Sequence, residues 1–212
     1  MRQLNSMDRF LGRIDAGLRA SAGVQPSARR ANPAANVHDG DLSADEARMV
    51  ARLVRVDHAG EVAAQALYEG QALTARKPEQ AQQLRAAAAE EADHLAWCAE
   101  RLDELNASPS KLGPVWYAGS FMVGAAAGLA GDRWSLGFVV ETERQVETHL
   151  DDHLQRLPAE DHRTRAILSQ MKIDESEHGR TAANAGGLPL PGPIRRVMHA
   201  VSRVMTVGAY WV

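Results

Sequence analysis

The chain has 212 residues, which is enough to bury one core and is typical of a single domain. Hydrophobic residues make up 45% of the chain but aromatic residues only 5%, a mixture that favours helices over sheets. The formal net charge of −3 excludes the strong basic field that nucleic-acid binding requires, so no nucleic acid is expected as a partner. The single cysteine, Cys98, excludes an internal disulfide, and its place on an apolar helical stripe predicts a buried side chain.

Residues 1–43 are predicted to be an N-terminal extension and linker. The N-terminus is charged throughout and lacks the apolar core of a signal peptide, which predicts a cytoplasmic chain. Residues up to about Ala20 have the spacing of a short amphipathic helix. From Ser21 to Asp41 the composition turns to Ser, Pro, Asn, Ala and Arg, which is typical of a linker.

Four long helices are predicted over residues 44–186. A capping box, Ser43-Ala-Asp-Glu46, opens the first of them. The helices are expected at Ala44–Arg76, Glu79–Asn106, Ser135–Leu157 and Ala159–Asn184. Because a proline separates the first pair and another separates the second pair, each pair should form an antiparallel hairpin. The fold prediction is therefore all-α, a four-helix bundle whose two hairpins are joined by one long apolar crossover.

The crossover, Ala107 to Trp134, holds an apolar segment rich in small residues, Pro114 to Ala130, which is slightly short for a transmembrane helix. Its glycines would permit either a channel for an isoprenoid tail or close helix packing. Residues 187–212 are predicted to be a stiff linker followed by an amphipathic helix from Ile194 to about Trp211. Basic residues and a terminal Tyr-Trp pair make this helix similar to interfacial membrane helices, although packing on the bundle would explain the pattern equally well.

Polar residues interrupt the inward apolar stripe of each of the four long helices. The six residues concerned are Glu61, Glu91, His94, Glu143, Glu175 and His178. They follow a repeated order, Glu and then Glu-x-x-His, in each half of the chain. One Glu-x-x-His pair alone is more often a solvated surface cluster, but two pairs in register with two further inward glutamates argue against that explanation.

A pair of metal ions would offset the free-energy cost of burying these charged side chains. Four ionised glutamates carry a charge of −4, which two divalent cations neutralise, and an unpaired buried carboxylate costs several kcal/mol. Carboxylate and imidazole without thiolate suit iron or manganese. The ligand set matches the known pattern of ferritin-like di-iron and di-manganese bundles, in which two helices give one Glu each and two give Glu-x-x-His.

The residues that orient these ligands are harder to predict. Asp57 shares a helix face with Glu61 and is the first candidate for an outer partner, followed by Asp93 and Asp174. In the third helix, Glu141 and Glu147 compete with Glu143 as the ligand. Glu141 falls off the stripe and Glu147 lies at its edge, so Glu143 is the expected ligand.

Four stretches resemble the demethoxyubiquinone hydroxylase family, the di-iron monooxygenases of ubiquinone biosynthesis. They are RVDHAGE from Arg55, EEADHL from Glu90, ETERQVETHLDDH from Glu141 and DESEHG from Asp174. The resemblance runs from Leu53 to the C-terminus. It implies that two iron ions per chain are held by the six residues given above, which also makes those residues catalytic.

The resemblance implies hydroxylation of the demethoxyubiquinol ring with O₂. No Gly-x-Gly-x-x-Gly stretch predicts a nicotinamide site, so electrons are expected from a partner, from the quinol, or from NADH bound in another way. Because a polyprenyl quinol lives in the bilayer, a peripheral position on the cytoplasmic side of the cell membrane is expected, with other ubiquinone-biosynthesis proteins as partners. No residue is singled out for substrate binding. The rival functions are a ferritin-type iron store and a di-manganese catalase.

Overall fold

The computed structural model describes residues 28–38 and 40–212, so the amphipathic helix expected before Ala20 lies outside the described residues. The described part is all-helical and contains no strand, which confirms the predicted fold class. Its helices are α2 (Ala44–Thr74), α3 (Pro78–Glu104), α4 (Gly113–Leu129), α5 (Asp132–Arg156), α6 (His162–Asn184) and α7 (Gly192–Trp211).

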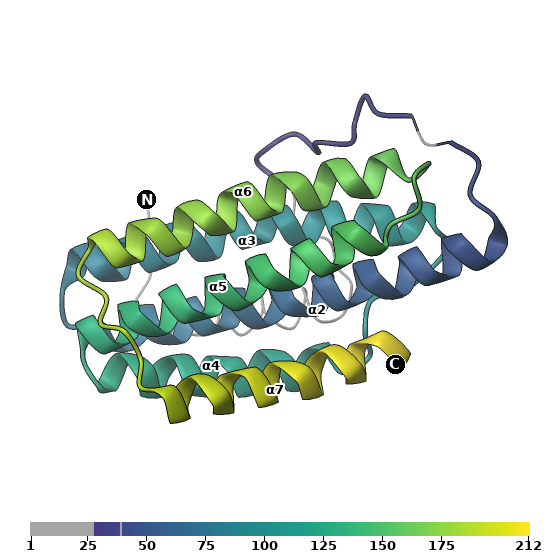
Figure 1. The fold of residues 1–212 in the computed structure, drawn as a ribbon. Coiled ribbons are helices and arrows are strands. Elements are labelled where there is room, and N and C mark those ends of the chain that lie inside the picture. Colours follow the sequence, from purple (N-terminus) through teal and green to yellow (C-terminus); the bar gives the residue numbers. More distant parts are fainter. Residues whose placement is uncertain (1–27, 39) are drawn as a thin grey trace, which may run out of the picture.

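Helices α2, α3, α5 and α6 form the bundle, and α4 and α7 lie side by side along one flank of it (Figure 1). The predicted capping box is present at the start of α2, where the Ser43 side chain accepts from the Glu46 backbone and the Glu46 side chain accepts from Ser43. Pro78 occupies the first turn of α3, where its missing N–H costs nothing. The two predicted hairpins, α2–α3 and α5–α6, are both formed.

Two predicted helix starts differ from the structure by three residues. The third bundle helix begins at Asp132 rather than Ser135, because Gly131 adopts a φ of 118° that turns the chain immediately before it. The fourth begins at His162 rather than Ala159, because the Asp161 side chain accepts a hydrogen bond from the Thr164 backbone and caps the helix there. Asp161 is held in this role by Arg101 Nη2 at 3.0 Å.

The crossover expected between the hairpins is itself a helix, α4, and it packs closely against α2. A Cβ atom on Gly124 would collide with the backbone carbonyl of Leu67, and one on Gly70 would collide with that of Phe121. Glycine on both helices therefore allows the two backbones to approach each other more closely than side chains would permit. The small residues of the crossover serve helix packing in this structure, which was one of the two explanations left open by the sequence.

The two largest apolar clusters of the core lie at opposite ends of the bundle. One holds Trp97, Leu102, Leu150 and Met171 among its buried residues. The other contains Leu67, Tyr68, Leu84, Leu136 and Val139. On each bundle helix the predicted polar residues lie between the parts that contribute to the two clusters, so the polar centre is enclosed at both ends. Cys98 is buried in the first cluster, as predicted.

The described part of the expected linker packs on the bundle. The Arg29 backbone N–H donates to Asp93 of α3 at 2.6 Å, and Arg30 pairs with Asp174 of α6 at 2.7 Å. Ala34 is fully buried in the first apolar cluster. This segment therefore bridges α3 and α6 from outside.

Close packing of α4 on α2 gives a direct stability prediction. Gly124→Ala should lower the free energy of unfolding by about 1–3 kcal/mol, because the added methyl group meets backbone that cannot move without displacing a helix. Urea unfolding followed by circular dichroism measures this free energy. Gly119→Ala is the matched control on the same helix, where a Cβ meets nothing within 4 Å. Equal losses in the two variants would contradict the assigned packing.

Candidate metal centre

The six predicted side chains meet in the middle of the bundle. They come from all four bundle helices: Glu61 from α2, Glu91 and His94 from α3, Glu143 from α5, and Glu175 and His178 from α6. All are buried except His178, whose burial is intermediate. Their ligand atoms form two groups of four, within each of which the atoms lie within 4.8 Å of one another. The groups are Glu61, Glu91, His94 and Glu175, and Glu91, Glu143, Glu175 and His178.

Glu91 and Glu175 belong to both groups, and each divides its two oxygens between them. Oε2 of Glu91 lies 3.0 Å from Nδ1 of His94, whereas its Oε1 lies 3.4 Å from Nδ1 of His178. Glu175 does the same, with Oε1 at 3.2 Å from His94 and Oε2 at 3.3 Å from His178. A carboxylate arranged in this way can bridge two ions. Glu91 and Glu175 are thus shared by the two groups, and each group adds one further glutamate and one histidine of its own.

The charges at the centre are strongly perturbed by one another. Burial and the neighbouring carboxylates raise the pKa of Glu61 well above its ordinary value, and the same causes raise that of Glu143. Although burial alone would lower the pKa of His178, the nearby carboxylates of Glu175 and Glu91, which favour the protonated ring, raise it to about 12. Without cations the centre therefore retains protons on groups that ordinarily lose them at neutral pH, because four carboxylates cannot all ionise there unaided.

Several oxygens at the centre have no hydrogen-bond partner among the described residues. The buried oxygens without a partner are both oxygens of Glu143, Oε1 of Glu91 and Oε1 of Glu175. A buried carboxylate oxygen left unpaired costs free energy that a coordinated cation would recover. The residues present therefore fit a pair of metal ions, and their oxygen and nitrogen donors without thiolate suit iron or manganese.

Each histidine is held from behind by an acid of the opposite motif. Nε2 of His94 lies 3.0 Å from Oδ2 of Asp174, and Nε2 of His178 lies 3.0 Å from Oε2 of Glu90. Asp174 directly precedes Glu175, and Glu90 directly precedes Glu91, so the two motifs hold each other's histidines reciprocally. In both cases Nδ1 is left to face the centre, which is how outer partners fix the orientation of a ligating histidine.

Only one of the three predicted outer partners takes that position. Asp174 contacts His94, but Asp93 faces away and accepts from the Arg29 backbone, and Asp57 pairs with other histidines. Glu90 was missed, although an acid immediately before the Glu of both Glu-x-x-His motifs was a visible signal. Of the rival glutamates, Glu141 binds Arg144 and lies outside both groups of four.

A small cavity of about 40 Å³ reaches the centre beside Glu61. It opens between α2, α5 and α7, and its apolar lining includes Val56, Val146 and Met205. Glu61 is the only one of the six central residues that lines it. The centre is therefore approached from the side that α7 covers.

Removing the acid behind a histidine should weaken metal binding. In Asp174→Ala, we expect the affinity of the centre for Co²⁺, used as a spectroscopic probe, to fall by about 10–100-fold, because His94 loses the partner that fixes its ring. Anaerobic titration of the chelator-treated protein measures this. Glu177→Ala is the control, since Glu177 is an exposed carboxylate on the same helix that pairs with Arg180. An unchanged affinity in Asp174→Ala would show that the contact has no orienting role.

Comparison with known proteins identifies the family of this chain. A family model described as the ubiquinone biosynthesis protein COQ7 matches residues 48–209. A 3-demethoxyubiquinol 3-hydroxylase of Cupriavidus metallidurans is 57% identical over 206 residues, covering 96% of this chain and 99% of that protein. Proteins with the same name from Nitrosococcus oceani (52% identical; 100% of this chain, 99% of theirs) and Legionella pneumophila (53%; 100% of both) also match. The chain therefore belongs to the COQ7 family of ubiquinone biosynthesis proteins.

Proposed function

We propose that this chain is a di-iron monooxygenase that hydroxylates the ring of a demethoxyubiquinol. The observation that carries the proposal is the pair of four-residue groups sharing Glu91 and Glu175, whose oxygens are divided between the two ends. The relatives named as 3-demethoxyubiquinol 3-hydroxylases, which match over nearly their whole length, support the substrate. The overall reaction inserts one oxygen atom of O₂ into a ring C–H bond and releases the other as water, with two electrons and two protons from a reductant.

In this proposal Glu61 and His94 would hold one iron ion and Glu143 and His178 a second, with Glu91 and Glu175 shared between the two. When bound, the reduced iron pair supplies electrons and open coordination positions for O₂. The chain's own residues then have three tasks. The two apolar clusters exclude water from the centre at both ends, and Asp174 and Glu90 keep the histidines in the ligating orientation.

The third task is access, which the cavity beside Glu61 provides. Its lining by Val56, Val146 and Met205 suits an uncharged aromatic ring better than a charged metabolite. Because the cavity opens against α7, the substrate is expected to enter past this helix. NADH or a quinol is the expected reductant.

The decisive test follows the oxygen atom. The protein is loaded with ferrous iron without air and then given a short-tailed demethoxyquinol, NADH and ¹⁸O₂. We expect a product with one labelled oxygen from the wild type and none from Glu175→Ala, which should also lose bound iron because this residue belongs to both ends of the centre. Iron and oxygen consumption with unchanged quinol would contradict the proposal and favour ferroxidase or peroxidase chemistry.

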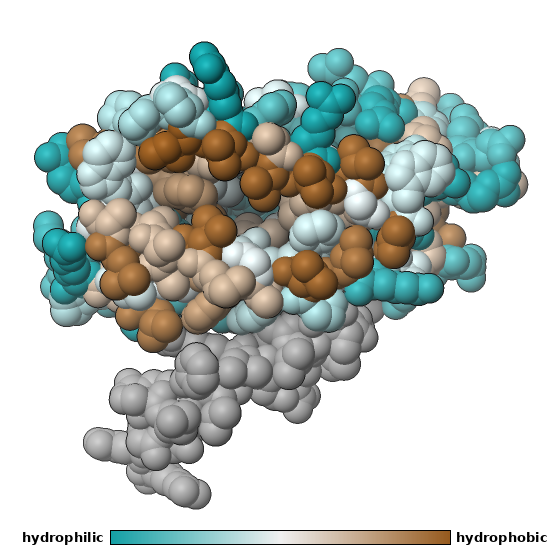
Figure 2. All heavy atoms as spheres, turned by 90° about the horizontal axis from the view of Figure 1, so that it is seen from below, coloured by the Kyte–Doolittle hydropathy of each residue, from teal (hydrophilic) through white to brown (hydrophobic). Residues whose placement is uncertain are grey.

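We further propose that the flank formed by α4 and α7 rests on the membrane that holds the substrate. No described helix is long and apolar enough to span a bilayer. Exposed apolar side chains nevertheless gather in rows across this flank (Figure 2). We call them the apolar face; they are Val115, Met122, Val123 and Leu129 of α4, and Ile194, Val197, Val201, Val204, Val207 and Trp211 of α7.

The charge on α7 fits the same orientation. Arg195, Arg196 and Arg203 are exposed beside the apolar face, as is typical of helices that lie in an anionic membrane interface. Such a patch exceeds the scattered apolar residues that a soluble surface normally carries. With the apolar face in the bilayer, a quinol would leave the lipid beside α7, on the side where the cavity opens.

Polar substitutions in the apolar face should therefore release the protein from lipid. The double variant Val201→Ser/Val204→Ser is expected to bind vesicles of anionic phospholipid about 10-fold or more weakly, because two exposed apolar side chains no longer transfer into the bilayer. Vesicle co-sedimentation measures this. Ile173→Ser is the matched control, since Ile173 is 62% exposed but lies on α6, outside the apolar face. Equal binding by the double variant and the wild type would exclude this face.

A further inference from the structure

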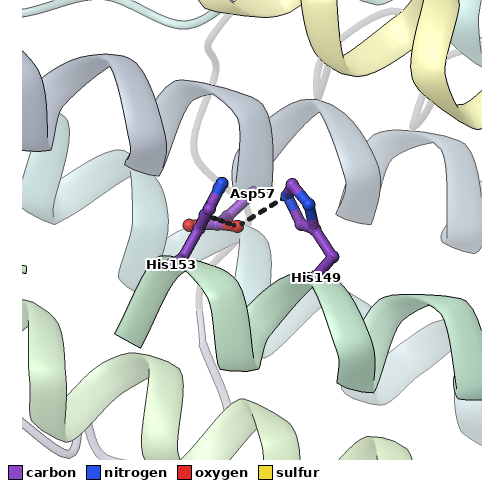
Figure 3. Close-up of side chains that lie close together, drawn as sticks. All are labelled: Asp57, His149 and His153. Carbon is purple, nitrogen blue, oxygen red and sulfur yellow. Dashed lines mark ion pairs between the residues drawn. The ribbon is translucent and has the colours of Figure 1, made fainter. Parts of the chain in front are cut away.

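We propose that Asp57, His149 and His153 form a separate site for one divalent transition-metal ion. His149 and His153 lie four residues apart on α5, so their side chains leave the same face of the helix. Both project toward Asp57, which comes from α2 (Figure 3). The three ligand atoms lie within 4.8 Å of one another, and none of the three residues belongs to either group of the central site.

The distances are those of a coordination shell. Oδ1 of Asp57 lies 2.8 Å from Nδ1 of His153 and 3.5 Å from Nε2 of His149. Oxygen and nitrogen ligands bind such ions at about 2.0–2.2 Å, and neighbouring ligands in tetrahedral or octahedral shells are then about 2.8–3.5 Å apart. The two measured separations fall at the two ends of this interval.

One short contact joins these groups, between Nδ1 of His153 and Oδ1 of Asp57. Oδ2 of Asp57 and Nε2 of His149 are buried without a hydrogen-bond partner among the described residues. Asp57 and His153 are only 3% and 2% exposed, so water has little access to them. The ring centroids of the two histidines lie 3.9 Å apart. An ion bound between the three side chains would satisfy the atoms that the single ion pair leaves without a partner.

The chemistry of the donors indicates the class of ion. Two imidazoles and one carboxylate suit Fe²⁺ and Zn²⁺, with further positions open to water or ligand. Here the open positions face the cavity beside Glu61, because Asp57 and His149 both line it. Although burial opposes it, contacts with His153 and His149 lower the pKa of Asp57 to about 2, so its carboxylate is ionised. A histidine that ligates a metal ion is neutral, so an ion at this site would replace any proton on the two imidazoles.

Zinc stoichiometry tests the site without relying on activity. The full chain is freed of metal with a chelator, equilibrated with micromolar Zn²⁺ and analysed for bound zinc. His153→Gln should bind one equivalent fewer than the wild type, because glutamine keeps the size of the side chain but replaces the ligating nitrogen. Equal zinc in both proteins would overturn the proposal and leave a buried Asp–His ion pair.

Glu175→Ala separates this proposal from the proposed function. It should lose the zinc of the central site and retain the equivalent bound by Asp57, His149 and His153. If only the central site fails to bind zinc, the wild type should still bind the zinc of the second site. His153→Gln should then lose this zinc, and Glu175→Ala should retain it. If His153→Gln does not fold, as judged by circular dichroism, crystals of the zinc-soaked wild type decide the question. An anomalous peak between the three side chains is expected, and its absence beside an occupied central site would overturn the proposal.

Discussion

The structure depends on how four carboxylates and two imidazoles are tolerated in the middle of a helical core. Burying one unpaired carboxylate already costs several kcal/mol, and here the oxygens of Glu143 lack any partner among the described residues. The rest of the bundle is arranged around that cost. Apolar clusters enclose the polar centre at both ends, which keeps water out and also prevents water from relieving the buried charges. Bound metal cations would satisfy these oxygens in place of retained protons, so folding energy and metal affinity would be linked.

The reciprocal contacts between the two Glu-x-x-His motifs give the bundle its register. Asp174 of α6 reaches His94 of α3, and Glu90 of α3 reaches His178 of α6. A shift of either helix by one residue would break both contacts and separate the oxygens that Glu91 and Glu175 present to the two ends. Arg30 stabilises the same part of the bundle from outside, since it pairs with Asp174 and lies over the ring of Trp97. The N-terminal segment thus belongs to the support of the centre.

Helical periodicity was sufficient to predict the bundle and the six central residues, because inward stripes and proline breaks depend on local sequence. It was insufficient where long-range contacts decide the structure. The α4 helix follows from glycine-to-backbone packing against α2, and α6 begins at His162 because Asp161 is held by a distant arginine, Arg101. Asp174 directly precedes the Glu of its motif, as Glu90 does, whereas Asp93 directly precedes the His, so Asp93 and Asp174 lie on different faces of their helices. Asp174 accordingly faces His94, and Asp93 faces the N-terminal segment.

The centre is symmetric in its ligands but asymmetric in its surroundings. Glu143 lies against α6, where a Cβ on Gly179 would come within 3.3 Å of the Glu143 Cβ, and Glu143 does not line the cavity. Glu61 lines the cavity under α7, and Asp57 lines the same cavity one helical turn away. Because α7 also carries much of the apolar face, a lipid-soluble substrate and the accessible end of the centre lie on the same side of the bundle. In the proposed function the C-terminal helix would therefore have two tasks: its exposed apolar side chains would rest on lipid, and its inner side covers the cavity beside Glu61.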